Sequence, residues 1–429
     1  MSSSHDGILL LPRPYARRSG KLLLLPLLPS PQPLRPLPSE VWSEIVAYVL
    51  LSEGTAEIAS RLLRICKGFT EIALPLVYAR VDLSTILSLE RFQKRLHSAE
   101  QKWDSIRRIP YSTPGRWVQA LELSKLAFTG QAEALQFDSI LTSLFPLVPF
   151  LARLTLNPSF VLSRRALASL GERDEAVSLR SLQGISYVFG PMALWERDPF
   201  IGLLRNCIYL EELDVVGQGS DPAELEFNFQ DAGDFPPESF KPLNLQRLKT
   251  LSLLSMFSSP LMMALLFSSL PSLRKLMLTP YDDIPYPSSL VSRFISVHGE
   301  MLQSLLLLTP KSWPTRLHPS PRTLLEISPH LRHLSLEQPI PALVLAGTHP
   351  LQILSIPRPT SDLWHALETL LLRLPELRVI RTRDVRWLRI GMNSRAQEAG
   401  VQGEMREWSK RLSRRGVRLL DADWSDARD

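Results

Sequence analysis

A short hydrophobic pattern recurs along most of this 429-residue chain. The pattern is Leu-x-x-Leu-x-Leu, and its clear copies begin at Val118, Leu151, Leu210, Leu248, Leu273, Leu302, Leu331 and Leu351, with degraded copies at Leu179 and Leu377. The last two leucines of each copy alternate with other residues, so both point to one side of a short strand. Stretches with helix-compatible hydrophobic spacing, such as 261–267, 290–295 and 363–374, lie between the copies. The pattern therefore predicts a repeated unit in which a strand is followed by a helix.

The spacing of the copies identifies the kind of repeat. Successive copies start 20 to 38 residues apart, and a period of roughly 20 to 29 residues is typical of leucine-rich repeats. The sequence resembles that family from residue 117 onward. The resemblance implies an α/β fold in which parallel strands form the inner face of a curved solenoid and helices lie outside. No copy carries the asparagine that regular repeats place after the strand, so we expect irregular turns and uneven curvature.

The residues between the buried leucines are expected to face the concave side of the solenoid, where solenoids bind partners. These candidate substrate contacts are Arg153, Thr155, Glu212, Asp214, Lys275, Met277, Leu306, Leu308, His333, Ser335, Glu337, Ile353 and Ser355. The set mixes acidic, basic and apolar side chains, which favours a protein partner over nucleic acid. A solvated strand face without a ligand is the alternative for any one of these residues.

A different pattern precedes the repeats. Trp42, Ile45, Val46, Val49 and Leu50 recur at the spacing of one helix face, and a second helical pattern runs from Thr55 to Leu76. Two short amphipathic helices bury little area alone. They are therefore expected to fold against each other and to present leftover apolar surface to a partner.

The same segment resembles an F-box. The sequence reads Leu37-Pro38-x-Glu40-Val41-Trp42-x-x-Ile45, followed by Leu62-Leu63-x-Ile65-Cys66-Lys67-x-Phe69, and the chain as a whole resembles fungal F-box proteins. It departs from the usual outline because Phe69 stands in a tryptophan place and because Gly68 falls within the helical pattern, where glycine costs about 1 kcal/mol relative to alanine.

The resemblance implies docking to the Skp adaptor of a cullin-RING ubiquitin ligase. The residues it assigns to adaptor binding are Leu37, Pro38, Val41, Trp42, Ile45, Leu62, Leu63, Ile65 and Cys66. The alternative is that these residues only fill a small helical core. Cys66, on an apolar helical face, is expected to be a buried small side chain rather than a nucleophile.

Composition narrows the function further. The chain has 82 leucines, yet 36 prolines interrupt them, and the longest purely apolar runs are far shorter than the roughly 18 residues of a membrane span. With only Cys66 and Cys207 the chain can build no disulfide framework or four-thiolate metal site, which favours a reducing compartment and a cytoplasmic or nuclear location. No phosphate-binding, nucleophile-elbow or metalloprotease motif is present. We therefore expect no enzyme, no metal and no cofactor.

The predicted organisation has five parts. They are a flexible Pro- and Leu-rich leader (1–36), an F-box-like helical module (37–83), a helical linker (84–116), a leucine-rich-repeat solenoid (117–390) with an acidic insert (217–240), and a basic C-terminal cap (391–429). The predicted function is a non-catalytic substrate receptor of a Skp-cullin-F-box ubiquitin ligase whose repeats bind a protein substrate. A scaffold, or a nucleic-acid binder that uses the basic residues between Arg378 and Arg418, is the alternative.

Overall fold

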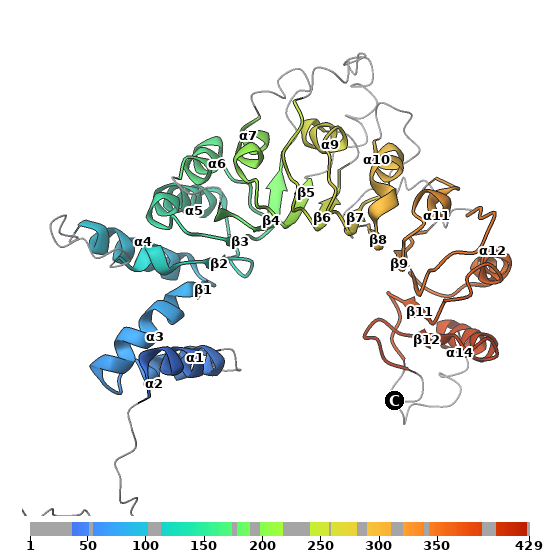
Figure 1. Cartoon of the computed structure of the whole chain (residues 1–429), viewed down its shortest axis with the longest axis horizontal. Coiled ribbons are helices and arrows are strands. Elements are labelled where there is room, and N and C mark those ends of the chain that lie inside the picture. Colours follow the sequence, from blue (N-terminus) through green and yellow to red (C-terminus); the bar gives the residue numbers. More distant parts are fainter. Residues whose placement is uncertain are drawn as a thin grey trace, which may run out of the picture.

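The computed structural model describes residues 37–50, 55–101, 113–173, 178–188, 198–217, 241–256, 259–280, 290–309, 321–338, 343–387 and 400–426. The predicted leader and, apart from Gly217, the predicted acidic insert lie outside these residues. Within them, the chain forms an arch whose inner side is one long sheet and whose outer side is a layer of helices (Figure 1).

Three helices form the N-terminal helical module, which we define as residues 37–79. They are α1 (Ser39–Val49), α2 (Thr55–Leu62) and α3 (Lys67–Ala79), and both α1 and α2 pack on α3. The single helical pattern predicted from Thr55 to Leu76 is wrong at one point, because the chain turns between α2 and α3. Cys66 has extended backbone there, and the Thr70 hydroxyl lies 3.1 Å from the carbonyl oxygens of both Leu63 and Cys66. Because the Thr70 hydroxyl satisfies these carbonyl groups, α2 can end before α3 begins.

Twelve parallel strands follow one another in chain order across a single sheet. They are β1 (Arg80–Asp82), β2 (Ala120–Glu122), β3 (Arg153–Thr155), β4 (Ser181–Tyr187), β5 (Glu212–Gly217), β6 (Thr250–Leu254), β7 (Lys275–Leu278), β8 (Ser304–Leu307), β9 (His333–Ser335), β10 (Ile353–Ile356), β11 (Val379–Thr382) and β12 (Arg418–Leu420). Each strand from β2 to β11 has its predecessor and its successor as neighbours, which is the topology of a solenoid. The predicted α/β leucine-rich-repeat-like solenoid is thus confirmed.

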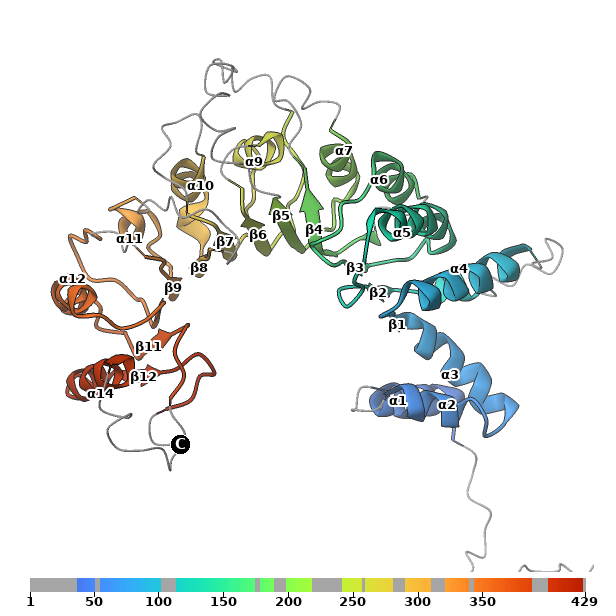
Figure 2. The same cartoon turned by 180° about the vertical axis from the view of Figure 1, so that it is seen from behind.

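Helices cover the outer side of this sheet, as both views of the arch show (Figure 2). They are α4 (Ile86–Gln101), α5 (Gln131–Leu144), α6 (Arg164–Gly171), α7 (Pro199–Asn206), α9 (Pro260–Leu266), α10 (Val291–His298), α11 (Leu324–Ile327), α12 (Ser361–Leu371) and α14 (Gly400–Ser413), with short 3-10 turns η1 (Pro114–Trp117), η2 (Phe145–Leu147) and η7 (Gly299–Met301). The described residues between β9 and β10 contain no helix. That unit is the shortest, at 20 residues from the start of β9 to the start of β10, which leaves little chain for an outer helix.

A leucine ladder forms the core of the array. One register position is occupied in successive strands by Leu121, Leu154, Leu182, Leu213, Leu251, Leu276, Leu305, Leu334, Leu354, Ile380 and Leu419. Every one of these side chains is at most 1% exposed. Because each strand buries its leucine against the next strand's leucine, the core is continuous from β2 to β12 although each unit is small.

The sheet extends beyond the predicted solenoid at both ends. β1 lies inside the predicted helical module, and α4, in the predicted linker, packs on α5 as the outer helix of a first unit. At the other end, β12 comes from the predicted cap, and α14 buries Met405, Trp408 and Leu412 on the face that their spacing predicts. The first unit has no clear copy of the leucine pattern, so the sequence alone did not reveal it.

One irregularity in the sheet depends on a glycine. The register between β4 and β5 shifts between Leu182 and Ile185. Gly184 in this bulge has φ +65°, and a Cβ built on it would lie 2.1 Å from the carbonyl oxygen of Leu156. Only glycine fits there, both by backbone conformation and by space.

None of the helices in the described part of the chain is both long and apolar enough to span a membrane.

Candidate protein-interaction surfaces

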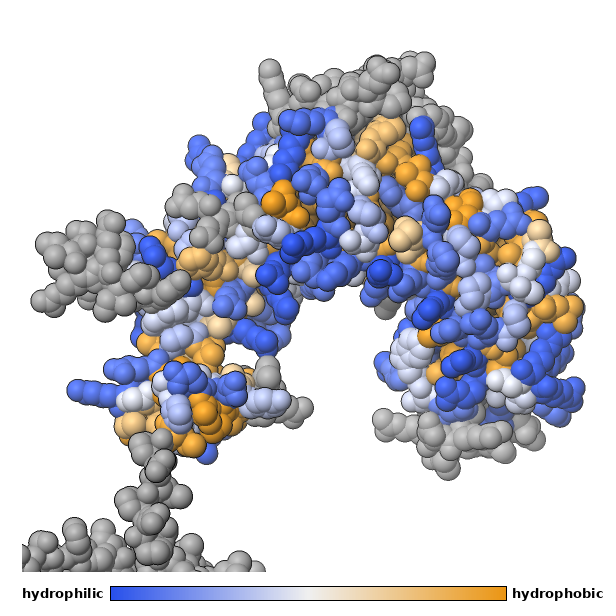
Figure 3. All heavy atoms as spheres, in the orientation of Figure 1, coloured by the Kyte–Doolittle hydropathy of each residue, from blue (hydrophilic) through white to orange (hydrophobic). Residues whose placement is uncertain are grey.

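The helical module carries an unusual amount of exposed hydrophobic surface. Of the fifteen large hydrophobic side chains that are exposed among the described residues, six lie in this segment: Leu37, Val41, Ile45, Tyr48, Val49 and Ile65. Figure 3 shows hydrophobic residues gathered at the surface of the helical module. A contiguous apolar surface on a small module is typical of a site that another protein covers.

Helix α1 has two apolar faces, and only one of them is packed. Trp42 and Val46 face α3, where the ring of Trp42 meets Phe69 edge to face with 5.0 Å between ring centroids. Val41 and Ile45, one helical turn apart, are 38% and 40% exposed. The exposed face continues to Tyr48, which is 80% exposed. The helix therefore keeps an apolar stripe that the described chain does not cover.

The predicted adaptor contacts divide into two groups in the structure. Leu37, Pro38, Val41, Ile45, Ile65 and Cys66 are exposed, whereas Trp42, Leu62 and Leu63 are half-buried. Phe69, which departs from the family outline, packs against Trp42 within the module. Gly68 is the second residue of α3 rather than an interior helical position, so its cost is smaller than the helical pattern implies.

The predicted burial of Cys66 is wrong. Cys66 is exposed and stands just before α3, because the turn between α2 and α3 takes it off the helical face. Cys207 is buried, and burial raises the pKa of its thiol to about 12. The buried thiol is thus protonated at neutral pH.

In the N-terminal half of the concave face, the predicted contacts partly hold the sheet together. The Glu212 carboxylate accepts hydrogen bonds of 2.9 Å from both Ser181 and Gln183 on the neighbouring strand. Asp214 accepts a bond of 3.2 Å from the backbone N–H of Gly184 in the bulge. Arg153 is exposed and Thr155 half-buried on β3. Arg153 is thus open to a partner, while the acidic pair also stabilises the β4–β5 junction.

In the C-terminal half, the concave face is partly covered. Lys275 is exposed, while Met277, Leu306, Leu308, His333, Glu337 and Ile353 are half-buried. The expectation that Ser335 and Ser355 face a partner is wrong, because each is only 1% exposed. The His333 ring lies 3.0 Å from the hydroxyl of Ser355 on the neighbouring strand β10. The His333 ring therefore lies against Ser355 on the concave side of the sheet.

The loop after β12, residues 421–426, lies on the inner side of the arch (Figure 1). Its Trp424, at φ +64°, stacks on the guanidinium of Arg381 at 4.4 Å and lies 6.4 Å from the ring of His333. Arg381 also donates to the carbonyl oxygen of Ala422 at 2.6 Å. Asp421 holds the loop by accepting the backbone N–H groups of residues 387, 423 and 425.

The leucine pattern missed these contributors to the concave face. Arg381 could have been found, because it follows the degraded copy at Leu377 at the interleaved position. Arg383 pairs with Glu337 and donates to the carbonyl oxygen of Leu336, so it bridges β11 and β9. No local signal marks Trp424, since its contacts come from a loop that folds back over the sheet.

His333 reports the electrostatics of this region. Burial, followed by the positive charges of Arg381, Lys275 and Arg383, lowers its pKa to about 4. The imidazole is therefore neutral at physiological pH.

The basic end of the array is partly committed to packing. Arg411 on α14 pairs with Glu407 and lies over the ring of Trp364, 5.1 Å from its centroid. The Trp364 ring in turn meets Trp408 edge to face at 5.1 Å. Arg411 therefore stabilises the last two outer helices, which limits what it offers to nucleic acid.

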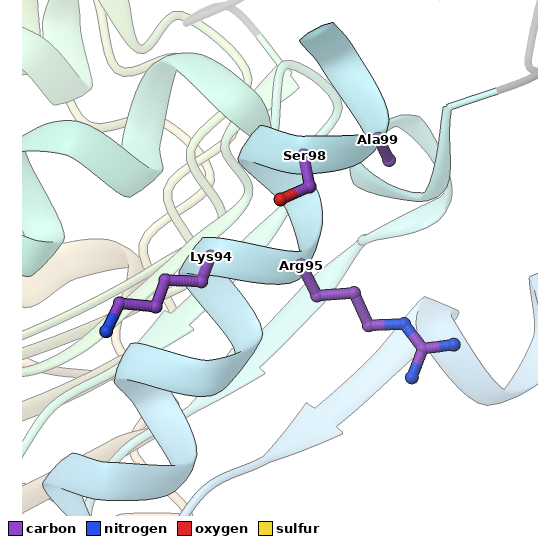
Figure 4. A pocket seen from close by; sticks show the side chains of 4 residues that line it. All are labelled: Lys94, Arg95, Ser98 and Ala99. Carbon is purple, nitrogen blue, oxygen red and sulfur yellow. The ribbon is translucent and has the colours of Figure 1, made fainter. Parts of the chain in front are cut away.

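A shallow hollow lies on α4, lined by Lys94, Arg95, Ser98 and Ala99 (Figure 4). Lys94 and Arg95 point in different directions, and Lys94 pairs with Glu90 at 2.6 Å. One helix turn without converging groups offers no binding chemistry. Among the described residues, no cluster of histidine, cysteine, aspartate or glutamate could hold a metal ion.

Comparison with known proteins assigns this chain to no family. No protein-family model matches this chain, and no curated protein is similar to it. A crystal structure of a Bacteroides fragilis protein, a target of the Northeast Structural Genomics Consortium, aligns with a TM-score of 0.34 and 12% identity over 77% of this chain and 73% of that chain. A likeness of this extent carries no inference about function. The repeat-type solenoid with an N-terminal helical module stands on the geometry above.

Proposed function

We propose that this chain is a non-catalytic substrate receptor of a Skp-cullin-F-box type ubiquitin ligase. In this proposal the helical module docks the Skp adaptor, the solenoid binds a protein substrate, and other subunits transfer ubiquitin. The observation that carries the proposal is the uncovered apolar stripe of α1, which includes Val41 and Ile45 and coincides with the stretch that resembles an F-box.

The junction between module and solenoid supports this division of labour. Helix α3 ends at Ala79 and β1 begins at the next residue, so no linker separates the two parts. Tyr78 packs between Phe92 of α4 and Trp117 of η1, with ring centroids 6.2 Å and 6.0 Å away. A receptor that must present its cargo to other subunits benefits from such a stiff connection, because little conformational entropy is lost on assembly.

The adaptor contact can be tested on α1 directly. We expect Ile45→Asp to abolish capture of purified Skp adaptor by the full-length chain, since a charge would be buried in an apolar interface. Because Ile45 is 40% exposed, the thermal unfolding midpoint should change little. Leu135→Asp is the matched control, because Leu135 is 64% exposed on α5, away from the module.

Adaptor binding by the Ile45→Asp variant at wild-type strength would contradict the proposal. Equal loss of binding in Leu135→Asp would show that the assay reports general surface hydrophobicity instead. A lower unfolding midpoint in Ile45→Asp would mean that Ile45 is a core residue of the module.

A further inference from the structure

The concave face of β7 to β11 contains buried hydrogen-bond donors without acceptors. Within the described residues, the Ser335 hydroxyl, Nε of Arg381 and Nε of Arg383 are buried and make no hydrogen bond. Ser335 and Arg381 share one row of the sheet, in register with Ser355 between them. Buried donors are costly to leave unpaired, but Ser335 lies too deep to meet a partner, so half-buried Arg381 is the group of this row that suits a ligand with acceptor oxygens.

The charges around this row are unbalanced. Burial is the main cause of the lowered pKa of His333, and the charges of Arg381, Lys275 and Arg383 all add to it. Arg383 is neutralised by Glu337, with side chains only 13% and 18% exposed. In contrast, neither Lys275 nor Arg381 has a carboxylate within ion-pair distance in the part of the chain that the structure describes.

The acidic groups of the loop after β12 fill this gap only in part, because the charges of Asp421 and Asp423 favour the protonated form of Arg381 but neither carboxylate pairs with it. Asp421 is 4% exposed and accepts backbone N–H groups of its own and a neighbouring loop. Asp423 pairs with Arg386 at 2.9 Å. Lys275 and, in part, Arg381 therefore remain available to a negatively charged partner on the inner side of the arch.

Apolar side chains lie between the two cations. Met277 and Leu306 are half-buried neighbours in register on β7 and β8, and Ile353 follows His333 in register on β10. Trp424 adds a ring that is 45% exposed over Arg381. This combination suits a peptide whose acidic side chains flank an apolar one, and it does not suit the uniform backbone of nucleic acid.

The spacing of the strands sets the spacing of the acidic groups. Lys275 on β7 and Arg381 on β11 are four strand intervals apart, which is about 19 Å at about 4.8 Å per interval. Each long side chain spans about a third of that gap, so two carboxylates about 7–13 Å apart can reach both cations. At about 3.3 Å per residue, this separation corresponds to roughly two to four residues of extended peptide.

We infer that the concave face from β7 to β11 binds an extended acidic segment of a partner protein. One carboxylate of the segment pairs with Lys275 and a second, about two to four residues away, pairs with Arg381. An apolar side chain between them packs against Leu306 and Trp424. The inference rests on the part of the proposed function that assigns protein binding to the repeats, and it is independent of adaptor docking.

The experiment uses the full-length chain without adaptor and an array of 12-residue peptides. Each peptide has a Gly, Ser, Leu and Phe background with two Asp or Glu residues one to six positions apart, and each has a partner in which Asn or Gln replaces the acids. We expect the strongest binding at separations of two to four, and about a hundredfold weaker binding for the amide partners, because each of the two lost charge-assisted hydrogen bonds contributes about tenfold. Equal binding of acidic and amide peptides would overturn the inference.

Variants assign the binding to this surface. Lys275→Gln and Arg381→Gln should each weaken the best peptide about tenfold, whereas Arg153→Gln, the same charge change on exposed β3 of the same face, should not. Lys275 is exposed, so its variant keeps the test valid if Arg381→Gln disturbs the loop after β12. Unchanged peptide binding in Lys275→Gln would place the site elsewhere and overturn the inference.

Two further measurements separate this inference from its competitors. The first uses a fluorescein-labelled oligo-dT of 20 nucleotides. If this probe binds where the acidic peptides do not, and if Lys275→Gln and Arg381→Gln abolish its binding, the surface binds nucleic acid and the inference is overturned. Adaptor capture should persist in Lys275→Gln. The acidic-segment site and the adaptor docking therefore fail independently.

Discussion

The helical module and the solenoid treat their hydrophobic residues in opposite ways. Among the described residues of the module, only Val46, Ala59 and Ala73 are buried, and the largest apolar side chains are exposed or half-buried. In the solenoid, a ladder of leucines at most 1% exposed runs through the sheet. The array completes its own core by stacking, whereas three short helices cannot. The difference indicates which apolar residues hold the fold together and which are free for a partner.

The largest expected effect compares one apolar residue from each region. Leu276→Ala, in a fully buried position of β7, should lower the free energy of unfolding by about 3 kcal/mol because it leaves a cavity. Ile45→Ala on the exposed stripe of α1 should change it by less than about 0.5 kcal/mol. Urea unfolding followed by circular dichroism measures both. Similar losses in the two variants would mean that the α1 stripe is core.

Glycine-to-alanine substitutions give the next largest difference in stability between the solenoid and the module. Gly184→Ala should cost about 2 kcal/mol, because its positive φ and the carbonyl oxygen of Leu156 exclude a Cβ. Gly68→Ala in the module should be neutral or stabilise by up to about 1 kcal/mol, since the only atom within 4 Å of the new Cβ is the Cys66 sulfur at 4.0 Å. Thermal unfolding of the two variants measures which loses more stability. A larger loss in Gly68→Ala than in Gly184→Ala would contradict the requirement for glycine in the β4 bulge.

Ion pairs give a smaller contrast. Arg383→Ala should destabilise by about 2 kcal/mol, because it strands a mostly buried Glu337 and frees the carbonyl of Leu336. Arg61→Ala breaks a pair with Glu57 in which both side chains are more than 70% exposed, so we expect a loss below about 0.5 kcal/mol. Equal losses in chemical denaturation would show that Arg383 does not bridge the strands in solution.

The smallest effect is a pH dependence of stability that arises from histidine titration. It concerns the solenoid, since the module contains no histidine. The pKa of His333 falls from 6.5 to about 4 on folding, so the unfolded chain binds its proton first. Stability should therefore fall as pH drops from 6.5 towards 4, by about 1 kcal/mol for this partly exposed group. Burial, followed by the charges of Arg381, Lys275 and Arg383, opposes its protonation.

Comparison with a variant isolates this contribution from that of the other titrating groups. His333→Gln should lose about 1 kcal/mol less than the parent between pH 6.5 and pH 4 in urea unfolding. His365→Gln, on the exposed side of α12, is the control and should follow the parent. A His333→Gln variant with the parent's acid sensitivity would contradict the covered position of this ring.

Local pattern predicted most of the fold. Alternating leucines gave strands where the structure has them, and the spacing of Met405, Trp408 and Leu412 predicted the buried face of α14. Prediction from hydrophobic spacing failed where the spacing gives no signal for the local structure. The turn before α3 depends on the Thr70 hydroxyl, and the first unit of the sheet has no leucine copy to mark it.

The candidate surfaces were less predictable for the same reason. The apolar stripe of α1 follows from its helical spacing, but which of its two faces is covered depends on packing against α3. On the concave face, Ser335 and Ser355 occupy interleaved positions as predicted, yet they are buried because the His333 ring and the loop with Trp424 lie over them.

The sequence by itself determined the repeat, the leucines that form its core and the side chains that alternate with them, because those depend on neighbours within a few residues. Tertiary structure decided which of those side chains remain open to a partner. That choice depends on contacts between residues far apart in the chain, such as Arg381 with Trp424 and Arg383 with Glu337. Such contacts form only after every strand is stacked and the curvature of the whole array brings its last loop over the sheet.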